Sequence, residues 1–143
     1  MNQATKIAIA VPAVFAALLI TLFVVWKTND EFFRQFRSFS VTVVNQSDYD
    51  LVSVETGILR SDAAGNAVQG GSKNTYGKTI KAGHEKVISP KLSLNGEGGI
   101  YLKYTDSRGQ TVQKTVCSYT ESASGYSTVT IRNDRVDVKE NCR

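Results

Sequence analysis

Two cysteines are the residues whose chemistry stands out most in this sequence. Cys117 and Cys142 are its only cysteines, and both lie in the C-terminal third of 143 residues. Paired cysteines in a small β domain are typical of an oxidising compartment, where disulfides persist. A bridge between them closes a loop of about 25 residues and stabilises the fold by roughly 3 kcal/mol in the chain-entropy treatment. We therefore expect a Cys117–Cys142 disulfide.

The other reactive side chains do not form a recognisable catalytic or ligand-binding motif. His84 is the single histidine and falls in an expected turn, without the clustered Cys or His residues that a zinc site needs. The serines lack a G-x-S-x-G context, and Gly96-Glu97-Gly98-Gly99 lacks the lysine and following helix of a phosphate loop. The sequence therefore predicts a protein that is not an enzyme and uses no metal or cofactor. A hidden pocket of converging polar residues would favour an enzyme instead.

Candidate partner-binding residues lie in and beside Ser61 to Gly77, the longest stretch without a β pattern. Such a long loop either binds a partner or is a solvated crossing between two sheets. Tyr76 is its aromatic candidate for an anchor, and Lys78 and Lys81 follow on an expected strand. The nearby lysines outnumber acids and suit an acidic partner or anionic lipid, or they only protect an edge strand from aggregation. We single out Tyr76, Lys78 and Lys81 as candidate partner-binding residues.

These residues belong to a region whose hydrophobic pattern alternates with period two. Phe39, Val41 and Val43 alternate with smaller or polar residues, and similar patterns recur at intervals of about 8 to 12 residues up to the C-terminus. Strands are expected at 38–44, 51–59, 78–81, 85–89, 99–105, 110–119, 126–132 and 135–139. The pattern predicts one all-β sandwich of the immunoglobulin-like or Greek-key type over residues 38–143, with seven or eight short strands.

The positions of the cysteines suggest how the last strands pair. Hairpin turns are expected at Asp106 to Gly109 and at Asn133-Asp134. If 110–119, 126–132 and 135–139 form a consecutive antiparallel meander, Cys117 and Cys142 lie at the same edge of one sheet. Flanking strands are about 9.6 Å apart, so the bridge also requires the chain after Lys139 to curl inward.

Before this domain, Ile7 to Trp26 runs twenty positions without a charge. A helix of that length spans about 30 Å, the hydrocarbon thickness of a bilayer. No small-residue cleavage site follows it, so an uncleaved transmembrane signal anchor is favoured over a cleavable signal peptide. Residues 1–6 then form a cytoplasmic tail, and residues 27–37 a juxtamembrane segment. That segment is either a short interfacial helix, a continuation of the membrane helix, or a stretch whose phenylalanines pack on the β domain.

The orientation rests on two conflicting signals. Lys27, Arg34 and Arg37 follow the apolar segment, and by charge bias they place the C-terminal domain in the cytoplasm. The cysteine pair favours the opposite side. We give more weight to the cysteines and predict a single-pass inner-membrane protein with its C-terminal domain in the periplasm.

A tethered domain without catalytic motifs suggests work by binding. Residues 40–143 carry thirteen basic and eleven acidic residues, an ordinary surface, and a periplasmic location excludes nucleic acid as a partner. The sequence predicts a membrane-anchored periplasmic protein-binding module, an accessory or adaptor component of an envelope complex. The alternative is an immunity protein that neutralises a toxin acting in the periplasm or on the inner membrane.

Overall fold

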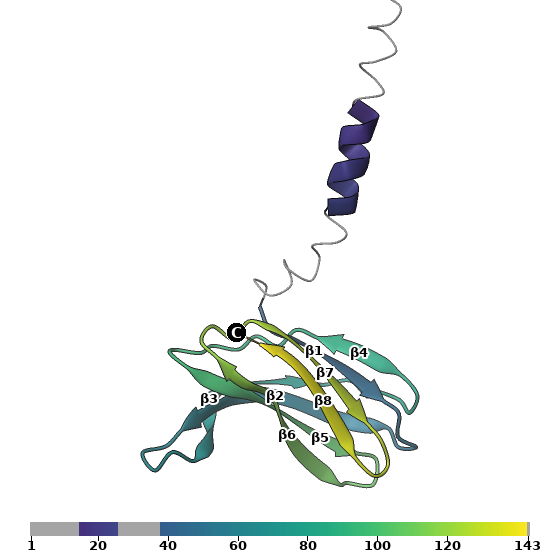
Figure 1. The fold of residues 1–143 in the computed structure, drawn as a ribbon. Coiled ribbons are helices and arrows are strands. Elements are labelled where there is room, and N and C mark those ends of the chain that lie inside the picture. The colour runs from purple at the N-terminus through teal and green to yellow at the C-terminus, as the bar shows by residue number, and fades with distance from the viewer. Residues whose placement is uncertain (1–14, 26–37, 143) are drawn as a thin grey trace, which may run out of the picture. The chain divides into compact units, whose positions relative to one another are not determined.

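The computed structural model describes residues 15–25 and 38–142. The chain divides into two units, Met1–Phe33 and Arg34–Arg143. The first contains a helix at 15–25 (Figure 1). The large apolar side chains of this helix are all at least half exposed. Within the described residues, no helix has the length and apolar character needed to cross a membrane. The rest of the expected anchor, 7–14 and 26, lies outside these residues, as do the expected tail at 1–6 and the segment 27–37.

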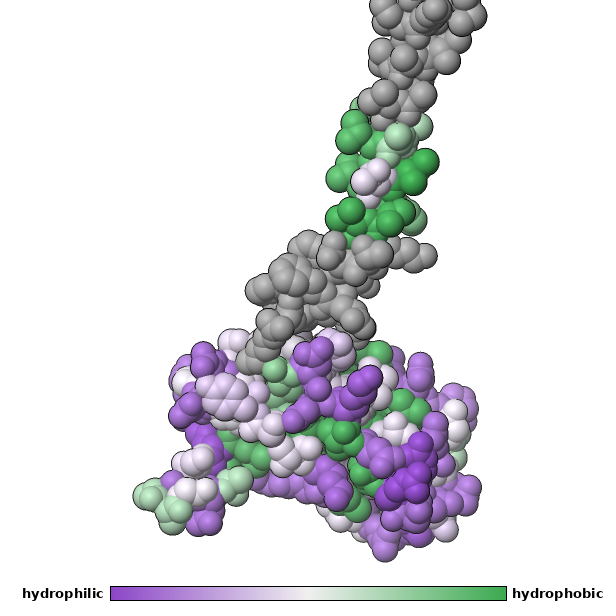
Figure 2. Space-filling view, in the orientation of Figure 1, coloured by the Kyte–Doolittle hydropathy of each residue, from purple (hydrophilic) through white to green (hydrophobic). Residues whose placement is uncertain are grey.

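The second unit is all β, as the alternating sequence pattern predicted. Its described residues form eight strands: β1 Ser40–Asn45, β2 Leu51–Ser61, β3 Ala67–Tyr76, β4 Glu85–Ile88, β5 Gly98–Asp106, β6 Thr111–Thr120, β7 Gly125–Ile131 and β8 Val136–Cys142. They form two four-stranded sheets, ordered β4-β1-β7-β8 and β3-β2-β5-β6 (Figure 1). The visible face of this unit is largely hydrophilic (Figure 2).

The core lies between the two sheets. On β1 and β7 every second side chain is buried, as expected of strands with one face on a core and one in solvent. Val41 and Val129 are fully buried from one sheet, and Val54 and Leu102 from the other. Fully burying one such side chain is worth about 1.5–3 kcal/mol, so these alternating residues set the strand register.

The first strand lies in the middle of its sheet. β1 pairs antiparallel with β4 and parallel with β7, so that Ser40 lies opposite Tyr126. β7 and β8 form a two-residue hairpin at Asn133-Asp134, and β5 and β6 are joined by the Asp106 to Gly109 turn. Both hairpins confirm the sequence prediction.

The predicted loop from Ser61 to Gly77 is wrong over most of its length, because residues 67–76 form β3. This edge strand pairs along β2 through its backbone, although its glycines and polar side chains give no hydrophobic alternation. The predicted strand at 78–81 is also wrong, since it contributes only an isolated bridge between Ile80 and Leu51.

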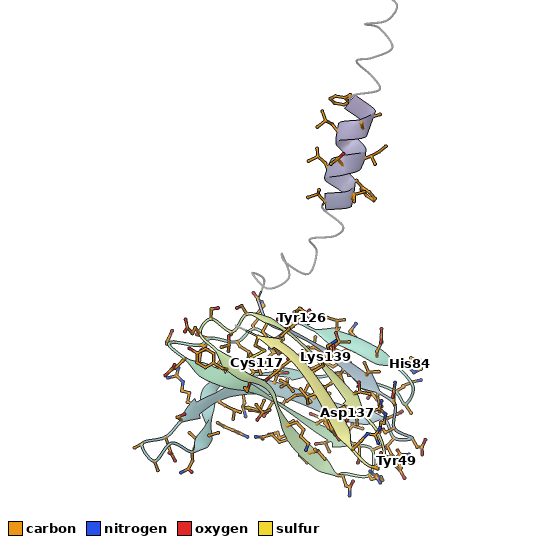
Figure 3. The ribbon with its side chains drawn as sticks, in the orientation of Figure 1. Tyr49, His84, Cys117, Tyr126, Asp137 and Lys139 are labelled. Atoms are coloured by element: carbon orange, nitrogen blue, oxygen red, sulfur yellow. A yellow bond between two sulfur atoms is a disulfide. The ribbon has the colours of Figure 1, made fainter. Side chains whose placement is uncertain are left out.

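The predicted meander is wrong as well, because β6 belongs to the opposite sheet from β7 and β8. The disulfide is confirmed: Cys117 on β6 is bonded to Cys142 on β8, with their Cα atoms 5.9 Å apart (Figure 3). Beside it, the backbone N–H of Ser118 donates to Glu140 over 2.7 Å. The bond therefore joins the edge strands of two facing sheets, so the last strand needs no inward curl to reach β6.

The sheet β3-β2-β5-β6 is strongly curled. Gln69 on β3 donates a hydrogen bond of 2.8 Å to Gln113 on β6, although two strands separate them. In a flat sheet these strands would be about 14 Å apart. The curl explains why Tyr101, which lies against Gly57 on the outward face, is only 1% exposed.

Candidate functional site

A pocket opens between the two sheets at the end opposite the disulfide. β6 and β8 are covalently joined near their C-terminal ends, and residues near their N-terminal ends, Val112 and Val136, line this pocket. Its volume is about 230 Å³. The two sheets are therefore held together by the disulfide at one end of β6 and β8, and they enclose the pocket at the other end.

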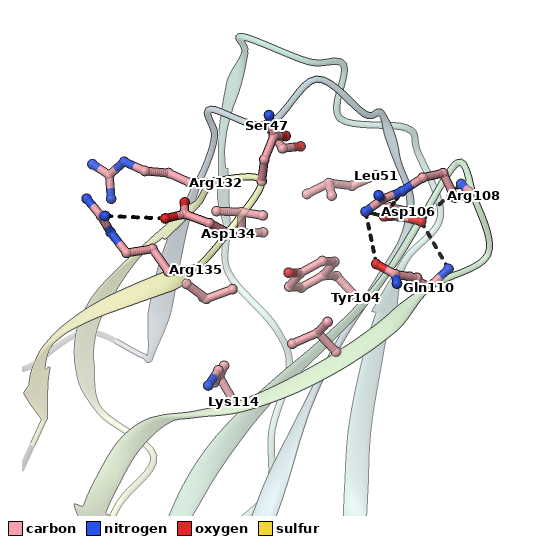
Figure 4. A pocket seen from close by; sticks show the side chains of 14 residues that line it. Ser47, Leu51, Tyr104, Asp106, Arg108, Gln110, Lys114, Arg132, Asp134 and Arg135 are labelled. Atoms are coloured by element: carbon pink, nitrogen blue, oxygen red, sulfur yellow. Dashed lines mark hydrogen bonds and ion pairs between the residues drawn. The ribbon is translucent and has the colours of Figure 1, made fainter.

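The floor of the pocket is apolar, with one polar atom. Leu51, Val112, Ile131 and Val136 supply the apolar surface, and the Tyr104 ring lies among them (Figure 4). Tyr104 is 6% exposed. Within the described part of the chain its hydroxyl has no hydrogen-bond partner, and the hydroxyl oxygen remains accessible to solvent. That hydroxyl therefore faces the pocket. Burial raises the pKa of Tyr104, and nearby Asp106 raises it further, so the hydroxyl keeps its proton at neutral pH.

One wall is the turn between β5 and β6, which Asp106 organises. One carboxylate oxygen accepts the backbone N–H groups of Arg108 and Gln110, each over 3.0 Å. The other accepts two guanidinium bonds from Arg108, of 3.0 and 2.7 Å. The Arg108 guanidinium also lies 3.6 Å from the centre of the Tyr49 ring and donates to Gln110 over 2.9 Å. Arg108 is therefore held rigidly at the pocket rim.

The opposite wall is the hairpin between β7 and β8. Arg135 pairs with Asp134 over 3.6 Å and with Asp137 over 3.3 Å, and Arg132 also pairs with Asp137. These pairs are solvent-exposed and individually worth little. The two guanidinium groups lie beside the pocket (Figure 4), where the carboxylates of Asp134 and Asp137 balance their charge.

Lys114 differs from the three arginines that line the pocket, because it has no ion pair among the described residues. It lies opposite the buried Leu102, on the same face of β6 as Val112 and Val116. Within the described residues its amine has no hydrogen bond or ion pair. An inward-pointing lysine on an edge strand discourages strand addition. It also gives the pocket an unpaired positive charge.

A second polar cluster lies on the outward face of the curled sheet. Glu55 accepts a hydrogen bond of 2.9 Å from Tyr101 and pairs with Lys103 over 2.8 Å and with Lys73 over 3.5 Å. The Lys103 bond lowers the pKa of Glu55 despite burial, and burial followed by the Glu55 bond raises the pKa of Tyr101 to about 12. Neither group titrates near neutral pH, so the pair is suited to holding the sheet and not to proton transfer.

We predict that acid destabilises the domain partly through Asp106. Burial alone would raise the pKa of Asp106, but the hydrogen bonds from Arg108 and the turn backbone outweigh it and lower the pKa. Its stabilising effect is therefore complete above the unfolded-state pKa, near 4, and is lost as the pH falls through the lower folded-state pKa.

Urea unfolding between pH 7 and pH 2 measures this effect. The free energy of unfolding of Asp106→Asn should be lower than that of the wild type at pH 7. The plots of this free energy against pH for the two proteins should converge as the pH falls below about 4. Curves that remain parallel down to pH 2 would show that Asp106 does not contribute in this way.

The residues singled out from the sequence lie away from this pocket. Tyr76 ends β3, where it is half-buried and packs against the core, and Lys78 and Lys81 are exposed in the segment after it. His84 is exposed beside the Ala82 carbonyl. Their role in partner binding stays a prediction. Among the described residues, no group of three or more His, Cys, Asp or Glu side chains could hold a metal ion.

Sequence reasoning located the two hairpins but missed the pocket between them. Arg108 lies within one predicted turn, and Arg132 and Arg135 flank the other. The usable signal was this concentration of arginines at two turns. The predicted meander, with β6 beside β7 in one sheet, leaves no space for a pocket between the two hairpins.

No family model matches the chain, and no curated protein matches it in sequence. Solved structures with weak similarity include an NMR structure of a protein from Eubacterium rectale, with 10% identity and a TM-score of 0.46 over 80% of this chain and 93% of that one. Pneumolysin matches with 14% identity and a TM-score of 0.39, over 75% of this chain and 24% of its own length. The separate membrane-binding domain of pneumolysin matches with 16% identity and a TM-score of 0.35, over 75% and 98%. At these values the likenesses carry no argument about function.

Proposed function

We propose that this chain is a membrane-anchored binding module whose β domain works outside the cytoplasm and engages a partner protein at the inter-sheet pocket. The observation that carries the proposal is the pocket itself. It has an apolar floor, a tyrosine hydroxyl without a hydrogen-bond partner among the described residues, and four cationic side chains around it: Arg108, Lys114, Arg132 and Arg135. A concave site with an apolar floor and a few convergent polar groups is the usual form of a binding site.

Two further features support the membrane-anchored, periplasmic part of the proposal. The uncharged stretch of residues 7–26 is long enough for a bilayer, and the helix at 15–25 exposes apolar side chains all around, as suits a helix in an apolar environment. The Cys117–Cys142 bond favours an oxidising compartment such as the periplasm. In this arrangement the anchor raises the local concentration of the domain near a membrane partner.

The pocket's chemistry favours binding over catalysis. Asp106 is held as an anion by Arg108, and Tyr104 is held neutral, so neither is ready to exchange a proton near pH 7. The arginines are permanent cations. Such groups are suited to recognising a ligand by charge and hydrogen bonding.

Site-specific photo-cross-linking in native membranes tests this proposal. A photoreactive residue in place of Gln110, on the pocket rim, is expected to capture a discrete partner. The same residue in place of Lys78 tests the interface suggested by the sequence, and in place of Ala63, in the β2–β3 turn, it provides an exposed control.

The pattern of cross-links decides between the possible interfaces and roles. A cross-link from Gln110 that Lys114→Glu abolishes supports binding at the pocket, whereas one from Lys78 alone moves the interface to the segment after β3. An envelope component as the captured partner supports an adaptor, and a toxin supports the immunity role. No discrete cross-link from any position would contradict the proposed function.

A further inference from the structure

We propose that the inter-sheet pocket recognises a carboxylate carried by a polypeptide, so that an acidic side chain or a chain end of the partner enters it. This rests on the proposed function and specifies its ligand. The charges around the pocket, the polar atom on its floor and its size each support the inference.

The charges favour an anion of low charge. Four cationic side chains line the pocket against two acidic ones, Asp106 and Asp134, and Asp137 outside the lining pairs with Arg132 and Arg135. Ion pairs within the domain involve all three arginines, whereas Lys114 has no partner among the described residues. A single carboxylate satisfies this amine. A phosphate dianion would meet stronger repulsion from the two acids in the lining.

The Tyr104 hydroxyl supplies a neutral donor beside this charge. Its ring is buried, its hydroxyl faces the pocket, and it retains its proton at neutral pH. A phenol that donates to a carboxylate forms a short, charge-assisted hydrogen bond. The amine and the hydroxyl come from neighbouring strands, β6 and β5, in which Tyr104 lies opposite Val112 and Lys114 opposite Leu102.

The size of the pocket and its apolar floor indicate that the carboxylate belongs to a polypeptide. At about 230 Å³ the pocket is smaller than the roughly 300–1,000 Å³ usual for drug-sized ligands. It suits one amino-acid side chain or one chain end. The apolar surface of Leu51, Val112, Ile131 and Val136 packs against the carbon atoms that carry the carboxylate, which a free inorganic anion lacks.

Peptide titration of the ¹⁵N-labelled full-length protein in detergent tests the inference. The probes are acetyl-Ala-Glu-Ala-amide with its Gln counterpart, acetyl-Ala-Ala-Ala bearing a free carboxylate with its amide, and inorganic phosphate. We expect saturable shifts of the Val112, Lys114 and Val136 amide signals with at least one carboxylate probe. Its neutral counterpart should bind at least about tenfold more weakly. Which carboxylate probe binds more tightly distinguishes a side chain from a chain end.

Variants assign the effect to the pocket. Lys114→Gln is expected to raise the Kd about tenfold, and Tyr104→Phe about threefold. Lys139→Gln removes the same charge from an exposed position on β8 that does not line the pocket, and it should leave the Kd unchanged (Figure 3). Thermal unfolding of each variant shows that the fold is retained.

Three results would overturn the inference: neutral peptides that bind as well as the carboxylate probes, phosphate that binds more tightly than either, or a Lys114→Gln variant with the wild-type Kd. If the Gln110 cross-link persists in any of these cases, the protein-binding function stands and only the ligand assignment fails. If the cross-link is absent while carboxylate peptides still bind, the pocket chemistry stands and the proposed partner role fails.

Discussion

Replacing Gly125 with alanine is expected to lower the free energy of unfolding by about 3 kcal/mol. Gly125 begins β7 with a φ of 98°, a conformation that costs an L-residue about 1–2 kcal/mol. An added Cβ would also meet the Asn141 carbonyl oxygen and lie 2.9 Å from the Cα of Cys142. That backbone cannot move away easily, because Cys142 is bonded to Cys117 on the other sheet. Overpacking of this kind adds about 1–3 kcal/mol.

Two other glycines separate the strain from the clash. Gly65 has a φ of 83° with open space around its Cβ position, so Gly65→Ala should cost only the backbone strain. Gly71 has open space and no unusual φ, so Gly71→Ala should change stability by less than about 0.5 kcal/mol. Urea unfolding of the three variants and the wild type measures the loss in the free energy of unfolding for each substitution. Equal losses for Gly125→Ala and Gly65→Ala would show that the clash with β8 has no effect.

The second large effect is expected from removing the disulfide. The double variant Cys117→Ala, Cys142→Ala should lose about 3.5 kcal/mol, because the bond spans 25 positions and restricts the unfolded chain. Cys117 is fully buried and Cys142 partly so, hence the lost packing adds to this value.

The control for this variant is chemical reduction of the wild type. Reduction opens the same bond without removing side-chain carbon or sulfur atoms. The stability lost by the double variant minus the stability lost on reduction therefore gives the contribution of side-chain packing. Denaturant unfolding with and without reductant, together with intact mass after alkylation, makes the comparison. Two freely alkylated thiols in the unreduced, unfolded protein would contradict the bond itself.

The sequence was sufficient to predict those strands that bury one face. β1 and β7 alternate in burial because every second residue packs in the core, and the period of two is visible without a structure. β3 was missed because it exposes or half-exposes all of its side chains and is held by the backbone of β2. The segment around Ile80 was taken for a strand because one buried apolar residue among polar ones resembles a short alternation.

The pocket could not be predicted because it depends on which strands pair. The sequence identified both hairpins that form its walls, yet hairpins specify only local neighbours. The predicted hairpin at Asp106 to Gly109 pairs β6 with β5, but nothing in the pattern showed that β6 and β7 belong to different sheets. The cysteine pair was compatible with a bridge inside one sheet and with a bridge between two, and only the strand order, which places β6 and β8 in different sheets, decides between them.

The position of β1 determines the order in which the domain can fold. Residues 51–120 supply every strand of the sheet β3-β2-β5-β6, so that sheet needs only the middle of the chain. β1 must wait for β4 and for β7, and Ser40 finds its partner Tyr126 only after 86 further residues have been made. Pairing over such separations is slow, because the entropy of closing the loop is lost before the contacts form. β1 precedes the other described strands, yet it is among the last to be paired, and its apolar residues, Val41 and Val43, stay uncovered until β7 and β8 are available.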